Sequence, residues 1–179
     1  MKKTILRYGL YAALCELISF VLAWLILTVF TIGITAQGYL GWAAILCPLI
    51  FIYFGIRYYR DCVNNGHISF LTALKVGLLI MTMPALFYAL IETVYVIYID
   101  PNFYENIYLH EVEEYRKTLS AVQFAQKIKE MKQELVLDNN PLYNFSVIVV
   151  FIAACGAIIT LISAVVLQRP LKQVVNADV

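Results

Sequence analysis

Residues 146–167 read SVIVVFIAACGAIITLISAVVL and contain no charged side chain. A helix of about 20 apolar residues covers the roughly 30 Å of hydrocarbon in a bilayer. The run is apolar on every face, whereas a strand of a membrane barrel would alternate over about ten positions. Because backbone groups in lipid must form hydrogen bonds within their own segment, this stretch predicts a membrane-spanning helix.

Three further apolar stretches precede it, at residues 8–30, 39–56 and 70–99. The chain is 62% hydrophobic and 14% charged, whereas an average soluble domain is about 45–50% apolar and about 25% charged. The first stretch is longer than the roughly 7 to 15 apolar residues of a secretory signal, so we expect it to remain uncleaved. The sequence predicts an all-α membrane protein, a four-transmembrane-helix bundle in a single membrane domain over residues 1–179.

The basic residues indicate an orientation. Four spans place both termini on one side, and Lys and Arg near span ends favour the cytoplasm. That side would hold seven basic residues, with Lys75 as an eighth, and the other side five basic residues accompanied by eight acids. The seven are Lys2, Lys3, Arg7, Arg57, Arg60, Arg169 and Lys172. We therefore expect cytoplasmic N- and C-termini, with residues 100–145 outside the cytoplasm.

Residues 100–145 form the only long polar connection, and their pattern is helical. Asp100 and Pro101 are expected to supply the N-cap and first turn of a helix. Ser120, with Gln123 three positions later, predicts a capping box at the start of a second helix. Apolar residues recur at helical spacing in both segments. They are Tyr104, Tyr108, Val112, Tyr115 and Leu119, then Phe124, Ile128, Met131 and Leu135.

This pattern predicts an amphipathic helical hairpin that ends where Asn139, Asn140 and Pro141 break the second helix. Its apolar stripe is expected to pack on itself or to lie on the lipid interface. A protein partner is the remaining use of such a surface. The fourth apolar stretch then begins at Ser146.

A family resemblance rests mainly on residues 59–77, YRDCVNNGHISFLTALKVG, followed by Asp100-Pro101 and Phe103. This run resembles the DUF4199-type proteins, bacterial four-span membrane proteins that form a domain family of unknown function. The family pattern usually has two glycines where this chain has Asn65 and Gly66. A turn is still expected there, because Asn tolerates left-handed backbone conformations. The resemblance implies an integral inner-membrane protein and implies no reaction, substrate or cofactor.

Ionisable side chains inside spans are candidate functional residues, because they are costly in lipid and usually face the protein interior. Glu16, Lys75 and Glu92 meet this description. Glu16 and Lys75 are expected at similar depths, so they would either pair or lie apart, with Lys75 reaching the interface on its long stem and Glu16 neutral. A transport or signalling role for these two residues is the third alternative, after the two structural ones. Glu92 is expected to bond Thr93, Tyr88 or a hydroxyl of another span.

Arg60 and Asp61 belong to the run that resembles the family and complete the set of candidate functional residues. The four cysteines are expected to be free thiols, because three lie in spans and Cys62 faces the reducing side. The net charge of +1 favours no nucleic-acid partner. We expect no cofactor and no metal, since His67 and His110 would lie on opposite sides of the membrane.

No motif of a known catalytic class is present in the sequence, so we do not expect an enzyme. The leading hypothesis is a non-enzymatic interaction or assembly protein, with the lipid bilayer as solvent and residues 100–145 as the partner-binding surface. The alternative is a small transporter or ion-coupled carrier subunit that uses Glu16, Lys75 and Glu92. A carrier would require a homo-oligomer, because four helices seldom enclose a pathway.

Overall fold

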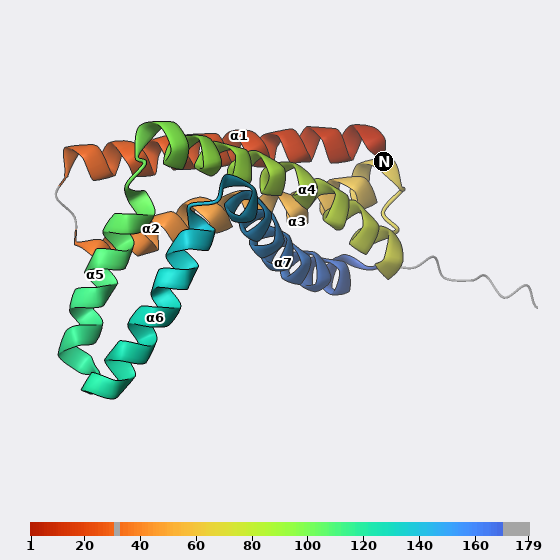
Figure 1. The fold of residues 1–179 in the computed structure, drawn as a ribbon. Helices are drawn as coiled ribbons and strands as arrows, with labels where there is room; N and C mark the ends of the chain where they lie inside the picture. Colours follow the sequence, from red (N-terminus) through yellow and green to blue (C-terminus); the bar gives the residue numbers. More distant parts are fainter. Residues whose placement is uncertain (31–32, 170–179) are drawn as a thin grey trace, which may run out of the picture. The chain divides into compact units, whose positions relative to one another are not determined.

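The computed structural model describes residues 1–30 and 33–169 of the chain (Figure 1). In this part of the chain every regular element is a helix, and one isolated backbone bridge joins Ile68 to Arg169. Four helices are long and apolar enough to cross a membrane: Lys2–Val29, Ala36–Val63, Phe70–Ile99 and Pro141–Leu167. The protein is therefore an all-α, multi-pass membrane protein built on a helical bundle, as predicted.

Two compact units divide the described residues. The bundle unit contains Met1–Tyr88 and the chain from Phe151, and the hairpin unit contains Ala89–Val150. The single membrane domain over residues 1–179 stays a prediction. Helices α4 (Phe70–Val94) and α7 (Pro141–Leu167) contribute residues to both units.

The first two spans begin or end beyond the predicted apolar stretches. Helix α1 covers Lys2–Val29 instead of 8–30, because a helix does not stop where its side chains become polar. The second span combines four pieces: α2 (Ile34–Leu46), a 3-10 turn η1 (Cys47–Leu49), α3 (Ile50–Tyr58) and a π-helix η2 (Tyr59–Val63). Pro48 lies in the 3-10 turn, where its missing N–H interrupts the regular α-helical bonding.

The third span covers the predicted range 70–99, as α4 followed by a π-helix η3 (Tyr95–Ile99). Ser69 begins it, because its hydroxyl accepts a hydrogen bond of 3.3 Å from the backbone N–H of Thr72. Helix α4 continues through Pro84. The fourth span, α7, begins at Pro141 instead of Ser146. Asn140 caps it by accepting the N–H groups of Leu142 and Tyr143 at 3.0 and 3.3 Å.

Small residues bring the helices of the bundle unit into close contact. Gly77 of α4 lies directly against Thr160 of α7, and a Cβ at Gly77 would overlap the Thr160 methyl group and lie 3.0 Å from Ile56. Thr160 is fully buried. Thr160 of the fourth span thus serves packing within the bundle unit, because close helix approach improves dispersion contacts in lipid.

The hairpin unit contains α5 (Phe103–Thr118) and α6 (Ala121–Asp138), which pack against each other. The hairpin helices thus cover 103–138, whereas we predicted a hairpin over 100–145. Both predicted stripes face inward. Met131 is 4% exposed, and the rest of the two stripes is half-buried. Those half-buried residues are Tyr104, Tyr108, Val112, Tyr115, Leu119, Phe124, Ile128 and Leu135.

One of the two predicted helix starts in the hairpin is confirmed. At the start of α6, the Ser120 side chain accepts the backbone N–H of Gln123 and the Ser120 N–H donates to Gln123 Oε1 at 3.3 Å, which is the predicted capping box. The Ser120 hydroxyl also donates to Gln123 Oε1, at 2.8 Å. The prediction for Asp100 is wrong, because Asp100 ends η3 and Asn102 is the N-cap of α5. The Asp100 carbonyl instead accepts the N–H of Phe103, so residues 100–103 form a turn.

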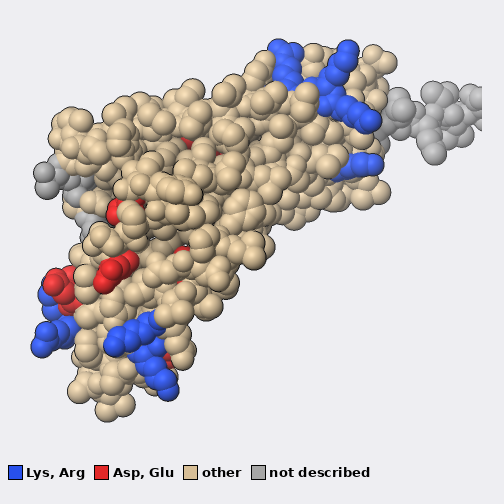
Figure 2. Space-filling view, turned by 45° about the horizontal axis from the view of Figure 1, so that its top comes forward, with Lys and Arg blue, Asp and Glu red and all other residues tan. Residues whose placement is uncertain are grey.

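Charges are distributed differently on the two units. Lys and Arg side chains gather over one end of the bundle unit, whereas basic and acidic side chains lie side by side on the hairpin (Figure 2). Lys172, which enters the count of basic residues above, lies outside the described residues. The chain start, the turn after η2 and the end of α7 share the basic end, since Lys2 and Val63 line one hollow and Ile68 bonds Arg169.

Candidate functional site

Glu16 lies in the interior of the bundle unit. It is 0% exposed, and neither carboxyl oxygen has a hydrogen-bond partner among the described residues. It occupies one face of α1 together with Ala12 and Ala13, which are also buried. A buried carboxyl without a partner is costly when charged.

Lys75 does not pair with Glu16. It lies exposed on α4, five residues after the helix begins at Phe70. The structural pair between the first and third spans is therefore absent from this arrangement. Exposure near a helix end fits the alternative in which the Lys75 stem extends toward the interface.

Arg60 and Asp61 lie together at the end of the second span. Arg60 is 8% exposed and donates from Nε and Nη2 to the two carboxylate oxygens of Asp61, at 2.6 and 3.0 Å. Its Nη1 donates to the backbone carbonyl of Leu167 at 3.4 Å, across 107 positions of sequence. Leu167 is the last residue of α7, so the Arg60 guanidinium satisfies a carbonyl that the helix leaves unbonded.

The turn that follows Arg60 makes a second link to α7. Asn65 and Gly66 have φ angles of 52° and 80°, so the left-handed turn expected at Asn65 is present. The N–H of Gly66 bonds the Arg60 carbonyl at 2.8 Å, which closes the turn. Ile68 and Arg169 then exchange two backbone hydrogen bonds of 3.0 and 2.8 Å. The run that resembles the family thus joins the second, third and fourth spans at one end.

Glu92 accepts a hydrogen bond from the hairpin. The hydroxyl of Tyr104, on α5, donates to Glu92 Oε1 at 3.2 Å. The Thr93 hydroxyl instead donates to the carbonyl of Ala89. Burial, and then the negative charge of Glu92, raise the pKa of the Tyr104 hydroxyl, which therefore stays protonated and remains a donor.

A small acid-lined cavity lies between α5 and α6 beside Tyr104. Its volume is about 60 Å³, and the carboxyl groups of Glu111, Glu134 and Asp138 line it with the hydroxyls of Tyr104 and Tyr108. Burial, and then the nearby Glu134, raise the pKa of Asp138. The described residues contain no group of three or more His, Cys, Asp or Glu side chains arranged to hold a metal ion. The cavity is therefore a polar joint of the hairpin.

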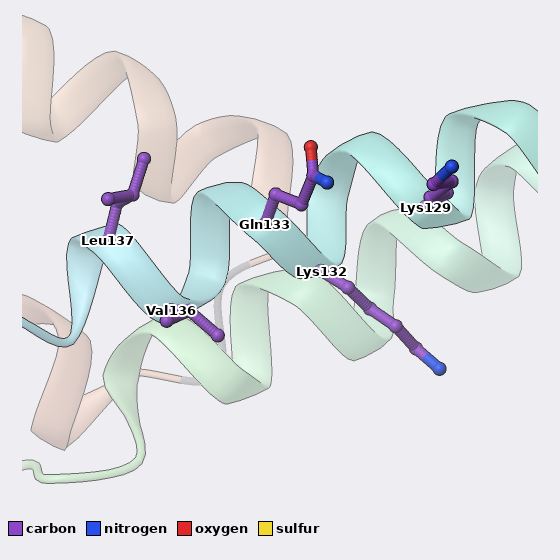
Figure 3. Close-up of a pocket in the computed structure, with 5 residues that line it drawn as sticks. All are labelled: Lys129, Lys132, Gln133, Val136 and Leu137. Atoms are coloured by element: carbon purple, nitrogen blue, oxygen red, sulfur yellow. The ribbon is translucent and has the colours of Figure 1, made fainter.

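The outer face of α6 carries a shallow groove with cations beside apolar side chains. Lys129, Lys132, Gln133, Val136 and Leu137 line it (Figure 3), and Val136 is 72% exposed. All five of these side chains are exposed, whereas Met131 of the same helix is buried.

The family model for the protein of unknown function DUF4199 matches residues 7–169. The chain belongs to this family. No curated protein and no solved structure matches the chain. The match covers all four spans and the hairpin, so the DUF4199 fold in this chain includes both units.

The four candidate residues in the bundle unit of this DUF4199 chain do not form one site. Arg60 and Asp61 are bonded to each other, whereas Glu16 has no partner and Lys75 is exposed. Glu92 belongs to the hairpin unit.

Three residues that contribute to the contacts around Glu92 and to the hairpin cavity were not predicted as site residues: Tyr104, Asp138 and Asn144. Asn144 is 5% exposed and affects the pKa of Tyr104. Tyr104 had been placed in the hairpin stripe, and its spacing from Glu92 gave no signal that the chain reverses between them.

Proposed function

We propose that this protein is a non-enzymatic membrane protein that acts by interaction or assembly, and that the outer face of α6 is its partner-binding surface. One observation carries the proposal. Helices α5 and α6 pack through their apolar stripes, whereas Lys129, Lys132, Val136 and Leu137 are exposed and line one groove on α6. Two cations beside two apolar side chains fit an amphipathic protein segment with acidic residues.

Orientation is part of the proposal. Positive charges near span ends favour the cytoplasm, which supports cytoplasmic termini, an inner-membrane location and a hairpin on the extracytoplasmic side. The test places a single cysteine at Ser120 in a variant whose four native cysteines are replaced by serine. A membrane-impermeant thiol reagent added to intact cells should label it, and should not label a variant that retains Cys62 alone. Labelling of the variant that retains Cys62, without labelling at position 120, would contradict this orientation and indicate the opposite one.

Partner binding is tested by photo-crosslinking from a photoreactive residue at Gln133 in cells. We expect a discrete crosslinked product that disappears when Lys129→Glu and Lys132→Glu reverse both charges. The matched control is Arg116→Glu with Lys117→Glu, which reverses two exposed charges on α5. Loss of the product in both variants, or its retention in both, would contradict a site on α6.

The carrier remains a second candidate because Glu16 is fully buried without a partner. A carboxyl inside a bundle serves proton-coupled transport when it releases its proton, binds a passing cation in its place and later takes up a proton again. The test measures pH-dependent cation flux into proteoliposomes for the unaltered chain and for Glu16→Gln, with Lys75→Met and Glu92→Gln as further variants. Flux that Glu16→Gln abolishes would favour the carrier, and absence of flux in the unaltered chain would remove it.

A further inference from the structure

A second hollow, separate from the hairpin, opens at the basic end of the bundle unit. Its volume is about 580 Å³, within the range of roughly 300–1,000 Å³ that small-molecule sites occupy. Lys2, Lys3 and Arg7 of α1 line it, opposite Tyr58 and Val63 of the second span. It is wide enough for a phosphate group with its attached glycerol.

The charge of this hollow has one sign. Three cations line it, no acidic residue does, and the first turn of α1 contains no acid. The ion pairs in the described part of the chain involve Arg57, Arg60 and Lys117, and none involves the three cations of the hollow. Like charges held together without a counter-charge repel one another, so an anion bound between them would lower the energy of the arrangement.

Arg7 is held in place over the hollow. Its Nε donates to the Tyr11 hydroxyl at 2.9 Å, and its guanidinium lies 5.6 Å from the Tyr11 ring centre and 5.5 Å from that of Tyr58. Contacts with two rings restrict the side chain before any ligand arrives. The two terminal nitrogens stay available for the paired bonds that Arg makes with phosphate oxygens.

The surroundings favour a lipid over a free anion. The hollow lies at the end of a membrane-spanning helix, where headgroups are found. Leu6 and Leu10, on the same stretch of α1, are 58% and 46% exposed and offer an apolar surface for acyl chains. Tyr58 is an aromatic residue of the kind that lies at the interface. Inorganic phosphate would use the cations and gain nothing from the leucines.

We propose that the hollow formed by Lys2, Lys3 and Arg7 with Tyr58 binds the phosphate of an anionic phospholipid from the adjoining leaflet. The lipid fills the space between the first and second spans, and its negative charge offsets part of the repulsion among the three cations. This site is independent of the partner surface on α6.

Native mass spectrometry of the full chain in detergent tests this, with phosphatidylglycerol and phosphatidylcholine as probes. The unaltered chain should retain phosphatidylglycerol and release phosphatidylcholine. Each basic residue near a lipid surface contributes about a factor of five to binding, so Lys2→Gln with Lys3→Gln and Arg7→Gln should weaken phosphatidylglycerol binding about a hundredfold.

The matched control removes three hairpin charges outside the partner surface, by Arg116→Gln, Lys117→Gln and Lys127→Gln, and should bind phosphatidylglycerol as the unaltered chain does. If the variant of the hollow fails to fold, Lys2→Gln with Lys3→Gln, at two exposed positions, should still weaken binding about 25-fold. Equal binding by the unaltered chain and the hollow variants would overturn the proposal. Displacement of the lipid by inorganic phosphate at comparable concentration would overturn it too, because the site would then select a free anion.

Discussion

The bundle unit and the hairpin unit hold their helices together in different ways. In the bundle unit, Gly77 brings α4 onto Thr160 of α7, with no room for one additional carbon atom. In the hairpin unit, α5 and α6 meet through long side chains around Met131, and the capping box at Ser120 fixes where α6 begins.

The difference follows from the solvent of each unit. Lipid tails are as apolar as leucine, so burying a leucine between spans gains little and close contact between backbones becomes the source of stability. Helices in water are driven together by the transfer of apolar side chains out of water. One chain therefore contains two kinds of core, and substitutions should act on them by different rules.

The largest effect is expected from adding one carbon at the closest contact of the bundle unit. Gly77→Ala places a Cβ against Thr160 and Ile56, so α4 and α7 must separate, which costs about 3 kcal/mol. Unfolding of the purified protein in mixed micelles measures this. The control is Gly41→Ala, where a Cβ meets nothing within 4 Å, and it should leave stability unchanged or slightly raised. Equal losses at the two glycines would show that close packing is not the source of stability.

Met131→Ala should have the next largest effect, and it should be confined to the hairpin. Removing the best-buried side chain of α6 leaves a cavity and lowers stability by about 2 kcal/mol, at the lower end for such changes because two helices can partly close the gap. Hydrogen exchange should show faster opening of 103–138 and unchanged protection of the buried part of α4. Val122→Ala, at an 80%-exposed position, is the control. A uniform loss across both units would mean that they unfold as one.

Tyr104→Phe tests the polar contact that links the third span to the hairpin. It removes the donor to Glu92 Oε1 and should cost about 1 kcal/mol, because a half-buried carboxyl loses a hydrogen bond. Faster hydrogen exchange at residues 100–106 should report this loss of stability. Tyr98→Phe, at a 78%-exposed position, should change nothing. If Tyr104→Phe leaves hydrogen exchange at these residues unchanged, the contact contributes no stability.

The smallest effect concerns pH and Asp138. Because its pKa in the folded hairpin is raised above the ordinary 3.8, the folded state binds this proton more tightly than the unfolded state. The stability that this protonation contributes is therefore fully present below pH 3.8 and is lost as the pH rises through the pKa of Asp138 in the folded state. Asp138→Asn should raise the melting temperature slightly at neutral pH and leave it unchanged in acid.

Glu114 offers a control of opposite sign, because the hydrogen bond from Lys117 lowers its pKa. Glu114→Gln should therefore lower stability slightly at neutral pH. The same direction of change in both variants would contradict the role of burial at Asp138.

The sequence predicted those features of the fold that depend on neighbouring residues. The length of the apolar stretch predicted the third span at 70–99, and the helical spacing of apolar residues predicted both hairpin stripes. The capping box at Ser120 and the left-handed turn at Asn65 follow from the preferences of single side chains. The start of α7 at Pro141 was open to the same reasoning, since Asn followed by Pro is a common N-cap and first-turn pair.

The candidate sites were less predictable because they depend on contacts between distant residues. Arg60 reaches Leu167 across 107 positions, and no local pattern reports that distance. Glu92 meets Tyr104 only because residues 100–103 reverse the chain. Lys75 and Glu16 share a depth along their spans, but depth alone leaves the rotation of each helix undetermined.

The bond between Arg60 and the end of α7 also sets an order of events during synthesis. Translation at about 5–20 residues per second separates Arg60 from Leu167 by roughly 5–20 seconds, since 107 positions lie between them. Until then, the first three spans lack the hydrogen bond from Arg60 to Leu167, because the fourth span has not yet been synthesised. Arrival of the last helix, rather than insertion of the first, is then the step that completes the membrane fold.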